Sequence, residues 1–530
     1  YRATPPATSE EEPTRREEEA AVLEVARISF GRRISWLLLP ALASMMLLAV
    51  TNHVCQDVAV VPFFWVVPLA LYLLSFIICF DRETWYRRGL FGVLAAVAIV
   101  AVSLLGLESE VESLLERIGE DGPAFCQALV EWILRQHETI YEQADKLAVE
   151  ATGYMIMLFM VCMLCHGELA RWKPPASRLT DFFLMVAAGG ALGGIFVGLI
   201  CPQIFSTNVE IHAGIIASFL LATGILWDAF WNTWLMRRLW RKCTVFGFVV
   251  LLLIVIIQAQ FISITSDALV TVRNFYGVLT VNEYHRDEPD HILELLNGRI
   301  LHGSQFQDTL VSRIPTTYYD DESGIGTTLL NFRRGEPLRV GVVGLGTGTV
   351  AAYGTAGDYY CFYEINPNVP RLANTYFTYL RNSRADVEIV LGDARLSMER
   401  QSPQDYDIIT LDAFSGDAIP AHLLTKEAFE EYFRHLDPQG VVAVHVSNRD
   451  LDLVPVVGGI AKHFAIPVMI IESTDDGEVG EAGSDWMLMT RNEEFLQEPM
   501  VVGVAEEVQG TYTPIPLWTD QYSNLLEILN

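Results

Sequence analysis

Seven apolar segments of about 20 residues each constrain the fold of this chain more than any other feature of its sequence. A helix of about 20 mostly apolar residues is long enough to cross the hydrocarbon core of a lipid bilayer. The sequence therefore predicts an α-helical polytopic membrane domain over residues 34–264, surrounded by lipid. The segments lie at about residues 34–52, 58–80, 89–107, 151–170, 181–201, 211–230 and 243–263.

Lysine and arginine residues alternate between the loops that join these segments. They precede the first segment and recur in every second loop, whereas the loops near 53–57 and 201–210 contain none. Because basic loops stay on the cytoplasmic side, the alternation predicts a cytoplasmic N-terminus. Seven spans then place the C-terminal domain outside the cytoplasm. The basic residues are Arg27, Arg32, Arg33, Arg82, Arg87, Arg88, Arg171, Lys173, Arg178, Arg237, Arg238, Arg241 and Lys242.

Two charged stretches in this half are not expected to cross the membrane. Residues 1–33 begin with many Glu and Pro residues and are expected to form a flexible acidic N-terminal segment. Residues 108–150 are rich in Glu, and their apolar residues recur every three to four positions, which indicates amphipathic helices outside the bilayer. In the fifth segment, the glycine-rich run 189–194 predicts close packing against a neighbouring helix.

One motif in the fourth segment has the spelling of a haem attachment site. Cys162, Cys165 and His166 form the pattern Cys-Met-Leu-Cys-His, to which c-type haem is bound in other proteins. The motif lies at the cytoplasmic end of its segment in the predicted orientation, whereas haem is attached outside the cytoplasm. We therefore expect a helix end rather than a haem site here, and no metal site in the chain.

The charge of the chain excludes one class of partner. The net charge is −29, and the part from residue 265 onward holds 17 Lys and Arg against 40 Asp and Glu. Such a field repels phosphate backbones, so we do not expect the protein to bind nucleic acid. It attracts polycations.

Strands and helices alternate in the second half of the chain. Residues 265–337 combine alternating β-branched residues with turn signals, which predicts a small antiparallel β unit and a helix that follows it. Residues 338–530 predict an α/β Rossmann-like domain around a doubly wound, mostly parallel sheet. The predicted strands are 338–343, 359–364, 387–391, 407–411, 440–446 and 467–471.

A glycine run follows the first of these strands. Gly344, Gly346 and Gly348 stand between a strand and a helix, where glycines let the backbone approach a ligand closely. Glu364 ends the second strand, a position from which a carboxylate can accept hydrogen bonds from both ribose hydroxyls. Together they predict a nucleoside-binding site.

Acidic residues also follow the third and fourth strands. Asp393 and Ala394 follow the third strand, where the carboxylate can accept a hydrogen bond from an adenine amino group. Asp412 and Asp417 follow the fourth strand. Because ligands bind at the carboxyl ends of strands in such sheets, we expect these acids and Glu364 to converge on one cleft.

With these motifs, residues 270–530 resemble the polyamine aminopropyltransferases, the spermidine synthase family. The chain as a whole is similar to bacterial membrane-fused spermidine synthase-like proteins. The resemblance implies a spermidine synthase or class I methyltransferase type of Rossmann-like fold, a bacterial inner membrane and a homodimer. It rests on His302–Gln305, Pro315–Tyr319, Gly344–Gly348, Tyr363–Pro367, Gly392–Arg395, the run 412–425 and Leu517–Asp520.

The resemblance implies aminopropyl transfer from decarboxylated S-adenosylmethionine to a polyamine. A polyamine nitrogen attacks the propyl carbon beside the sulfonium, and methylthioadenosine leaves. The amine must be neutral to attack, so a base has to take its proton. The implied roles are base for Asp412, amine positioning for Asp417, ribose binding for Glu364, adenine binding for Asp393, and the amine side of the cleft for Gln305 and Tyr318.

The chain departs from the family pattern at two places. The family usually has a glycine triplet followed by Asp-Gly, whereas here the loop reads Gly-Leu-Gly-Thr-Gly. The usual Asp-x-x-Asp spacing is two residues longer between Asp412 and Asp417. Both departures are ordinary for the membrane-fused type.

Four functional hypotheses stay open at this stage. The first is a membrane-anchored aminopropyltransferase. The second is a non-catalytic membrane subunit whose synthase-like domain docks onto a larger complex, a hypothesis favoured by the predicted topology because decarboxylated S-adenosylmethionine is expected to be scarce outside the cytoplasm. The third is an S-adenosylmethionine methyltransferase, and the fourth is a transporter.

Overall fold

The computed structural model separates into a helical unit and an α/β unit, which are described one at a time. Asp417 and most of the stretches 1–33 and 108–150 lie outside the described residues. The residues described are 30–58, 65–82, 84–105, 146–230, 239–264, 268–332, 336–413, 420–448, 451–474, 480, 482–508 and 512–529.

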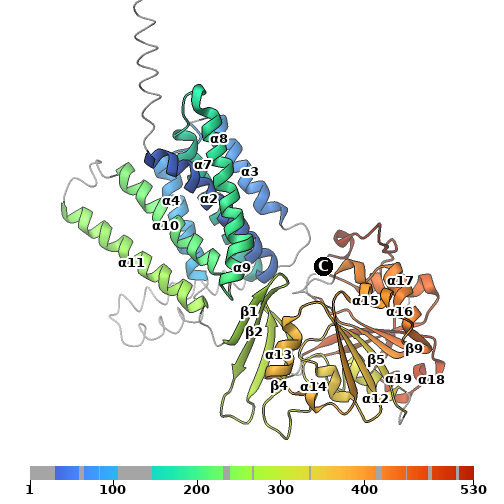
Figure 1. Cartoon of the computed structure of the whole chain (residues 1–530). Helices are drawn as coiled ribbons and strands as arrows, with labels where there is room; N and C mark the ends of the chain where they lie inside the picture. Colours follow the sequence, from blue (N-terminus) through green and yellow to red (C-terminus); the bar gives the residue numbers. More distant parts are fainter. Residues whose placement is uncertain are drawn as a thin grey trace, which may run out of the picture. The chain divides into compact units, whose positions relative to one another are not determined.

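The helical unit has a helix at each of the seven predicted segments (Figure 1). Four helices are long and apolar enough to cross a membrane by length and composition: Phe30–Cys55, Ala148–Arg171, Ala176–Ile204 and Val209–Ala229. Three shorter apolar helices occupy the other segments, so membrane insertion is supported while the count of seven spans stays a prediction. The helices are α2 (Phe30–Asn52), α3 (Val66–Asp81), α4 (Arg88–Leu105), α7 (Lys146–Arg171), α8 (Leu179–Ile195), α9 (Cys201–Ile204), α10 (Val209–Phe230) and α11 (Leu239–Ile264).

Helices α2 and α8 pack closely because α8 presents glycine to α2. A Cβ atom on Gly189 would lie 2.2 Å from the carbonyl oxygen of Leu37, and one on Gly193 would lie 2.3 Å from that of Ala41. Only a glycine leaves room for the neighbouring backbone at these distances. The close packing predicted from the run 189–194 is confirmed.

A buried carboxylate connects α7 to the start of α4. Glu168 is 2% exposed, and its Oε1 accepts hydrogen bonds from the Tyr86 hydroxyl and from Arg88 Nε, each at 2.9 Å. Arg88 also pairs with Asp228 on α10. A buried carboxylate needs such partners, because burial without them is costly.

The motif with haem-type spelling lies in the interior of the helical unit. Cys162, Cys165 and His166 are fully buried on α7. His166 Nδ1 lies 2.9 Å from the Ser75 hydroxyl, and its ring packs edge-on against Tyr72 and Phe76. No group of three metal-ligating side chains occurs among the described residues.

The α/β unit begins with the predicted antiparallel β unit, a four-stranded sheet in the order β1-β2-β3-β4. Residues 285–291 join β2 to β3, and a tight turn through Gly298 joins β3 to β4. The predicted helix that follows begins at Gly324, where the Ser323 hydroxyl accepts a hydrogen bond from Gly326 N and caps it. The elements are β1 (Ala268–Asn274), β2 (Gly277–Tyr284), β3 (Ile292–Asn297), β4 (Ile300–Phe306) and α12 (Gly324–Asn331).

The second sheet has eight strands in the order β12-β10-β11-β9-β8-β5-β6-β7. The strands β5 to β9 pair in parallel, whereas β11 pairs with β9 and β10 in an antiparallel manner. The sheet is therefore mixed, with a parallel part formed by β5 to β9 and an antiparallel edge formed by β10 to β12, and the fold is Rossmann-like. The strands are β5 (Arg339–Val343), β6 (Tyr359–Glu364), β7 (Asp386–Leu391), β8 (Tyr406–Leu411), β9 (Leu436–His445), β10 (Val468–Ser473), β11 (Ser484–Thr490) and β12 (Ala505–Glu507).

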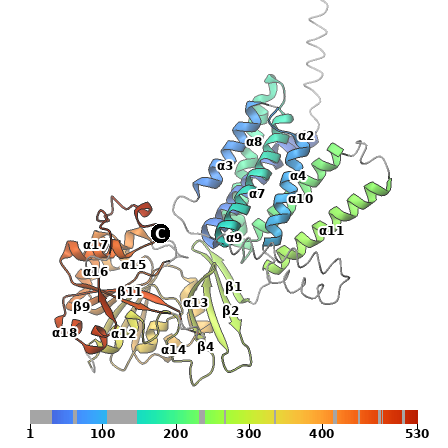
Figure 2. The same ribbon diagram turned by 180° about the vertical axis from the view of Figure 1, so that it is seen from behind.

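Helices cover both faces of this sheet, and each face has its own apolar core. Figures 1 and 2 show α15, α16 and α17 on one face and α12 and α14 on the other. Because both faces are covered, the central strands are largely apolar, and all six residues of β8 are buried. The helices are α13 (Asn368–Tyr376), α14 (Tyr379–Asn382), α15 (Ala394–Arg400), α16 (Lys426–His435), α17 (Val454–Phe464), α18 (Glu493–Leu496) and α19 (Pro499–Val502).

Candidate active site

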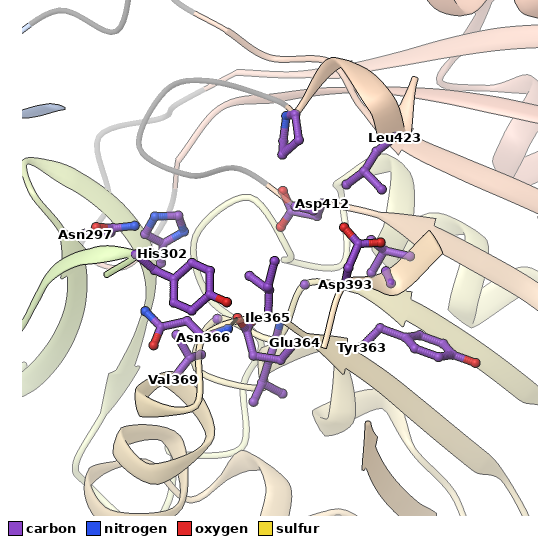
Figure 3. A pocket seen from close by; sticks show the side chains of 18 of the residues that line it. Asn297, His302, Tyr363, Glu364, Ile365, Asn366, Val369, Asp393, Asp412 and Leu423 are labelled. Carbon is purple, nitrogen blue, oxygen red and sulfur yellow. Dashed lines mark hydrogen bonds between the residues drawn. The ribbon is translucent and has the colours of Figure 1, made fainter. Parts of the chain in front are cut away.

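A cleft opens at the carboxyl ends of β5, β6 and β8, with residues of β2, β3 and β4 on its other side. Chain order runs from β5 to β6 on one side and returns through β8 on the other, so β5 lies at the point where the strand order reverses. Doubly wound sheets bind ligands at this point. Figure 3 shows Glu364, Asp393 and Asp412 around this cleft, as the sequence predicts.

The glycine loop after β5 has a backbone shape that other residues rarely adopt. Gly344 has a φ of +100° and Gly346 a φ of +55°. A Cβ atom would lie 2.1 Å from the Asp412 carbonyl oxygen at the first position, and 2.5 Å from the His302 carbonyl oxygen at the second. The loop therefore lies directly against two other cleft segments, and both glycines line the cleft.

Glu364 ends β6 as a buried carboxylate that is 8% exposed. Its Oε2 accepts a hydrogen bond from Leu345 N at 3.1 Å, and its Oε1 accepts one from Asn366 N at 2.7 Å. Burial raises the pKa of Glu364 above its ordinary value, although these backbone N–H groups oppose the shift. The two hydrogen bonds fix the carboxylate in the cleft wall, with lone pairs left to accept from a ligand.

Asp393 has two structural partners as well as its place in the cleft. Its Oδ1 accepts a hydrogen bond from Leu396 N at 2.9 Å and caps α15, and its Oδ2 lies 2.8 Å from His422 Nε2. Ala394 lies beside it in the cleft wall. His422 also lines the cleft, so Asp393 and His422 form one part of its wall together.

Asp412 follows β8, is buried, and has both oxygens hydrogen-bonded. His445 Nδ1 lies 2.8 Å from Oδ1, and the Tyr319 hydroxyl donates to Oδ2. Burial acts to raise the pKa of this carboxyl, but His445, the Tyr319 hydroxyl and nearby His302 overcome it, so the pKa of Asp412 lies below its ordinary value. The cleft therefore contains a fixed negative charge at neutral pH.

The imidazole of His445 is sandwiched between two aromatic rings. It stacks on Tyr318 at 4.8 Å and on Trp486 at 4.7 Å between ring centroids. Ser447 Oγ accepts a hydrogen bond from Asp485 N at 2.6 Å and lies 3.1 Å from His445 Nε2. Because an ionised carboxylate can only accept, Nδ1–H of His445 donates the hydrogen bond to Asp412 Oδ1.

Three other predicted site residues, Gln305, Tyr318 and Gly348, lie outside the cleft wall. Gln305 uses its amide to bind Ser312 O and the Oγ1 and backbone N of Thr378, at 2.7–2.8 Å. Tyr318 packs on His445, and Gly348 packs against Leu380. The ligand-binding roles of these residues stay predictions, as does the role of Asp417.

Sequence reasoning did not assign roles to Tyr319, His445, Trp486 or His302. Tyr319 and His302 belong to motifs that carry the family resemblance, and His445 ends a predicted strand beside β8. That strand end was a usable signal, because carboxyl ends of neighbouring parallel strands meet at one edge. Trp486 had no such signal, because β11 was not predicted.

Comparison with known proteins agrees with this geometry. No family model matches the chain. The chain is 36% identical over 117 residues to the polyamine aminopropyltransferase of Vibrio vulnificus, a match that covers 21% of this chain and 38% of that protein. Part of the chain is therefore similar to a polyamine aminopropyltransferase.

Two other similarities are weaker. Over 108 residues the chain is 32% identical to an N-terminal histidine N-methyltransferase of Emericella nidulans, which covers 20% of this chain and 19% of that protein. The crystal structure of a probable spermidine synthase from Corynebacterium glutamicum aligns with 48% of this chain and 98% of its own at 19% identity and a TM-score of 0.38. The chain spans less than half the length of the Vibrio vulnificus and Emericella nidulans proteins.

Proposed function

We propose that the spermidine synthase-like domain binds decarboxylated S-adenosylmethionine and transfers its aminopropyl group to a polyamine. The observation that supports this most is that Glu364 and Asp412 converge on one cleft around the glycine loop. Larger residues in this loop would collide with the neighbouring backbone. Glu364 lies where ribose hydroxyls need an acceptor, and Asp393 with His422 forms the neighbouring wall for the base.

Asp412 supplies the negative charge that an amine substrate requires. Its carboxylate is buried, ionised and held from two sides, so it can orient an ammonium or amine group without losing its own position. A methyltransferase has less need of such a charge, and the likeness to a polyamine aminopropyltransferase favours the same choice.

The experiment uses the full chain in detergent with decarboxylated S-adenosylmethionine and a panel of diamines and polyamines. Mass spectrometry follows methylthioadenosine and the lengthened amine. We expect turnover by the wild type, a loss of about 100-fold or more in Asp412→Asn, and wild-type rates in Asp386→Asn, an exposed residue outside the cleft. Equal rates for Asp412→Asn and the wild type would contradict the proposal.

The alternative to an enzyme is a non-catalytic docking module. The predicted topology favours it, because decarboxylated S-adenosylmethionine is expected to be scarce outside the cytoplasm. We propose seven spans, a cytoplasmic N-terminus and an extracytoplasmic α/β unit, because the basic loops alternate without interruption. A reporter fused after Asn530 that functions only in the cytoplasm tests this orientation. Activity of that reporter would contradict the orientation and remove the main argument for the alternative.

A further inference from the structure

His302 presents an unused nitrogen at the cleft. It lies on β4 and lines the cleft, and among the described residues its Nε2 is buried without a hydrogen-bond partner. Buried polar atoms nearly always have a partner, so an orphaned nitrogen beside a ligand cleft indicates that the ligand supplies it.

The backbone around His302 is fixed against the glycine loop. A Cβ atom on Gly346 would lie 2.5 Å from the His302 carbonyl oxygen, and a Cβ atom on Gly303 would lie 2.4 Å from Thr347 Oγ1. Figure 3 shows His302 and Asp412 higher in the view than Glu364 and Asn366. His302 is therefore placed beside the proposed adenosyl site, on the cleft wall that faces Asp412.

Asp412 is a poor acceptor for the proton of an alkylammonium. The hydrogen bonds to its two oxygens stabilise the ionised form, and its pKa lies below the ordinary value of about 3.9. An alkylammonium has a pKa of about 10.4, so the carboxylate is weaker as a base by a factor of more than about 10⁶. Its ionised state suits the binding of positive charge rather than the uptake of a proton.

His302 has the complementary properties. Burial lowers its pKa below the ordinary value of about 6.5, and the charge of Asp412 only partly opposes this, so the imidazole is neutral at pH 7. In the tautomer with its hydrogen on Nδ1, the lone pair of Nε2 is free to accept a proton. Once protonated, the ring is stabilised by the negative charge of Asp412.

We propose that His302 is the group that takes the proton from the attacking amine, a role that rests on the proposed aminopropyl transfer. The nitrogen lone pair forms the new C–N bond as the C–S bond breaks, and the electron pair of that bond stays on sulfur, which becomes a neutral thioether. The N–H proton passes to His302 Nε2, its electron pair remains on nitrogen, and the imidazolium later releases the proton to water.

The test compares His302→Gln with the wild type and with His463→Gln, an exposed residue in the last turn of α17. Methylthioadenosine binding by calorimetry reports whether the fold and the adenosyl site are intact. We expect His302→Gln to bind as the wild type does and to lose about 10²–10⁴-fold in kcat, the range for a missing general base. His463→Gln should keep both properties.

The pH profile separates a proton acceptor from a structural residue. The wild-type kcat/KM should be constant between the pKa of His302, which lies below about 6.5, and the pKa of the amine, about 10.4. The kcat/KM of His302→Gln should instead rise with pH across this range, because only the free amine reacts. Imidazole should restore part of the activity of His302→Ala. The other titratable groups that line the cleft are Tyr276, Tyr363, Glu364, Asp393, Asp412 and His422, with Tyr319 and His445 behind Asp412.

The outcomes distinguish this inference from the proposed function. If the wild type is active and His302→Gln has the same activity and the same pH profile, this inference is wrong while the proposed function stands. The inference also fails if the variant is slow by a constant factor at every pH and is not rescued by imidazole. A folded wild type that transfers no aminopropyl group to any amine overturns the proposed function and this inference with it.

Discussion

Replacing Glu364 with glutamine should abolish most of the affinity for the adenosyl group. The proposed ribose contact consists of two hydroxyls donating to an ionised carboxylate, and hydrogen bonds to a charged group contribute about 1.5–3 kcal/mol each. Loss of the charge and of one acceptor should therefore weaken binding by about 3 kcal/mol, on the order of 100-fold in Kd.

The same substitution should also cost stability in the absence of ligand. Glu364 accepts from both Leu345 N and Asn366 N, whereas a glutamine side chain has only one oxygen to offer. One buried N–H is left unpaired, which costs about 1–3 kcal/mol. A lower Tm should therefore accompany the weaker binding.

Calorimetry of methylthioadenosine binding to the full chain in detergent measures the effect. Glu388→Gln is a matched control, because Glu388 is an exposed glutamate of the same sheet that accepts from Tyr359 at 2.6 Å outside the cleft. The wild type should also lose affinity on acidification at a pH above the ordinary glutamate pKa of about 4.3, because the pKa of Glu364 is raised and protonation removes an acceptor. A Kd for Glu364→Gln within about threefold of the wild type would refute the ribose-binding role.

Three further predictions test the packing of the site and of the helical unit. Gly344→Ala should abolish methylthioadenosine binding and lower the Tm, because its Cβ would lie 2.1 Å from the Asp412 carbonyl oxygen. Gly459→Ala is the control, because a Cβ atom there meets open space in a helix. It should stabilise the protein by about 0.5–1 kcal/mol, and a lower Tm for it would contradict this reasoning. Tyr319→Phe removes a donor to Asp412, so the pKa of that carboxyl rises toward about 3.9. Acidification should therefore unfold the variant at a higher pH than the wild type. Acid-unfolding curves of the two proteins that coincide by circular dichroism would argue against this. Glu168→Ala leaves the partly buried Arg88 without its buried carboxylate partner and should cost about 3 kcal/mol of unfolding free energy. Thermal unfolding in detergent checks this, and an unchanged Tm would contradict it.

The sequence predicts the strands of the α/β unit well wherever a strand is buried on both faces. The run that became β8 is apolar enough to be recognised without any neighbour, and its six residues are all buried. β11 could not be predicted in the same way, because nothing local indicates that Ser484–Thr490 inserts between β9 and β10 in an antiparallel manner. The mixed character of the sheet follows from that insertion.

The acids of the site were predictable by position, but their partners were not. Strand ends placed Glu364, Asp393 and Asp412 on one cleft, as expected from the topology. That Asp412 is held by Tyr319 and His445 depends on contacts across 93 and 33 residues of sequence, which no local pattern encodes.

The measurement that tests the central claim most directly is the stoichiometry of a single turnover by the full chain. Decarboxylated S-adenosylmethionine and one diamine are mixed with excess wild-type protein, and methylthioadenosine and the aminopropylated amine are quantified by mass spectrometry. The account predicts equal amounts of the two products, and neither product from Asp412→Asn. A wild type that binds methylthioadenosine yet forms neither product with any amine would contradict it and leave a docking module.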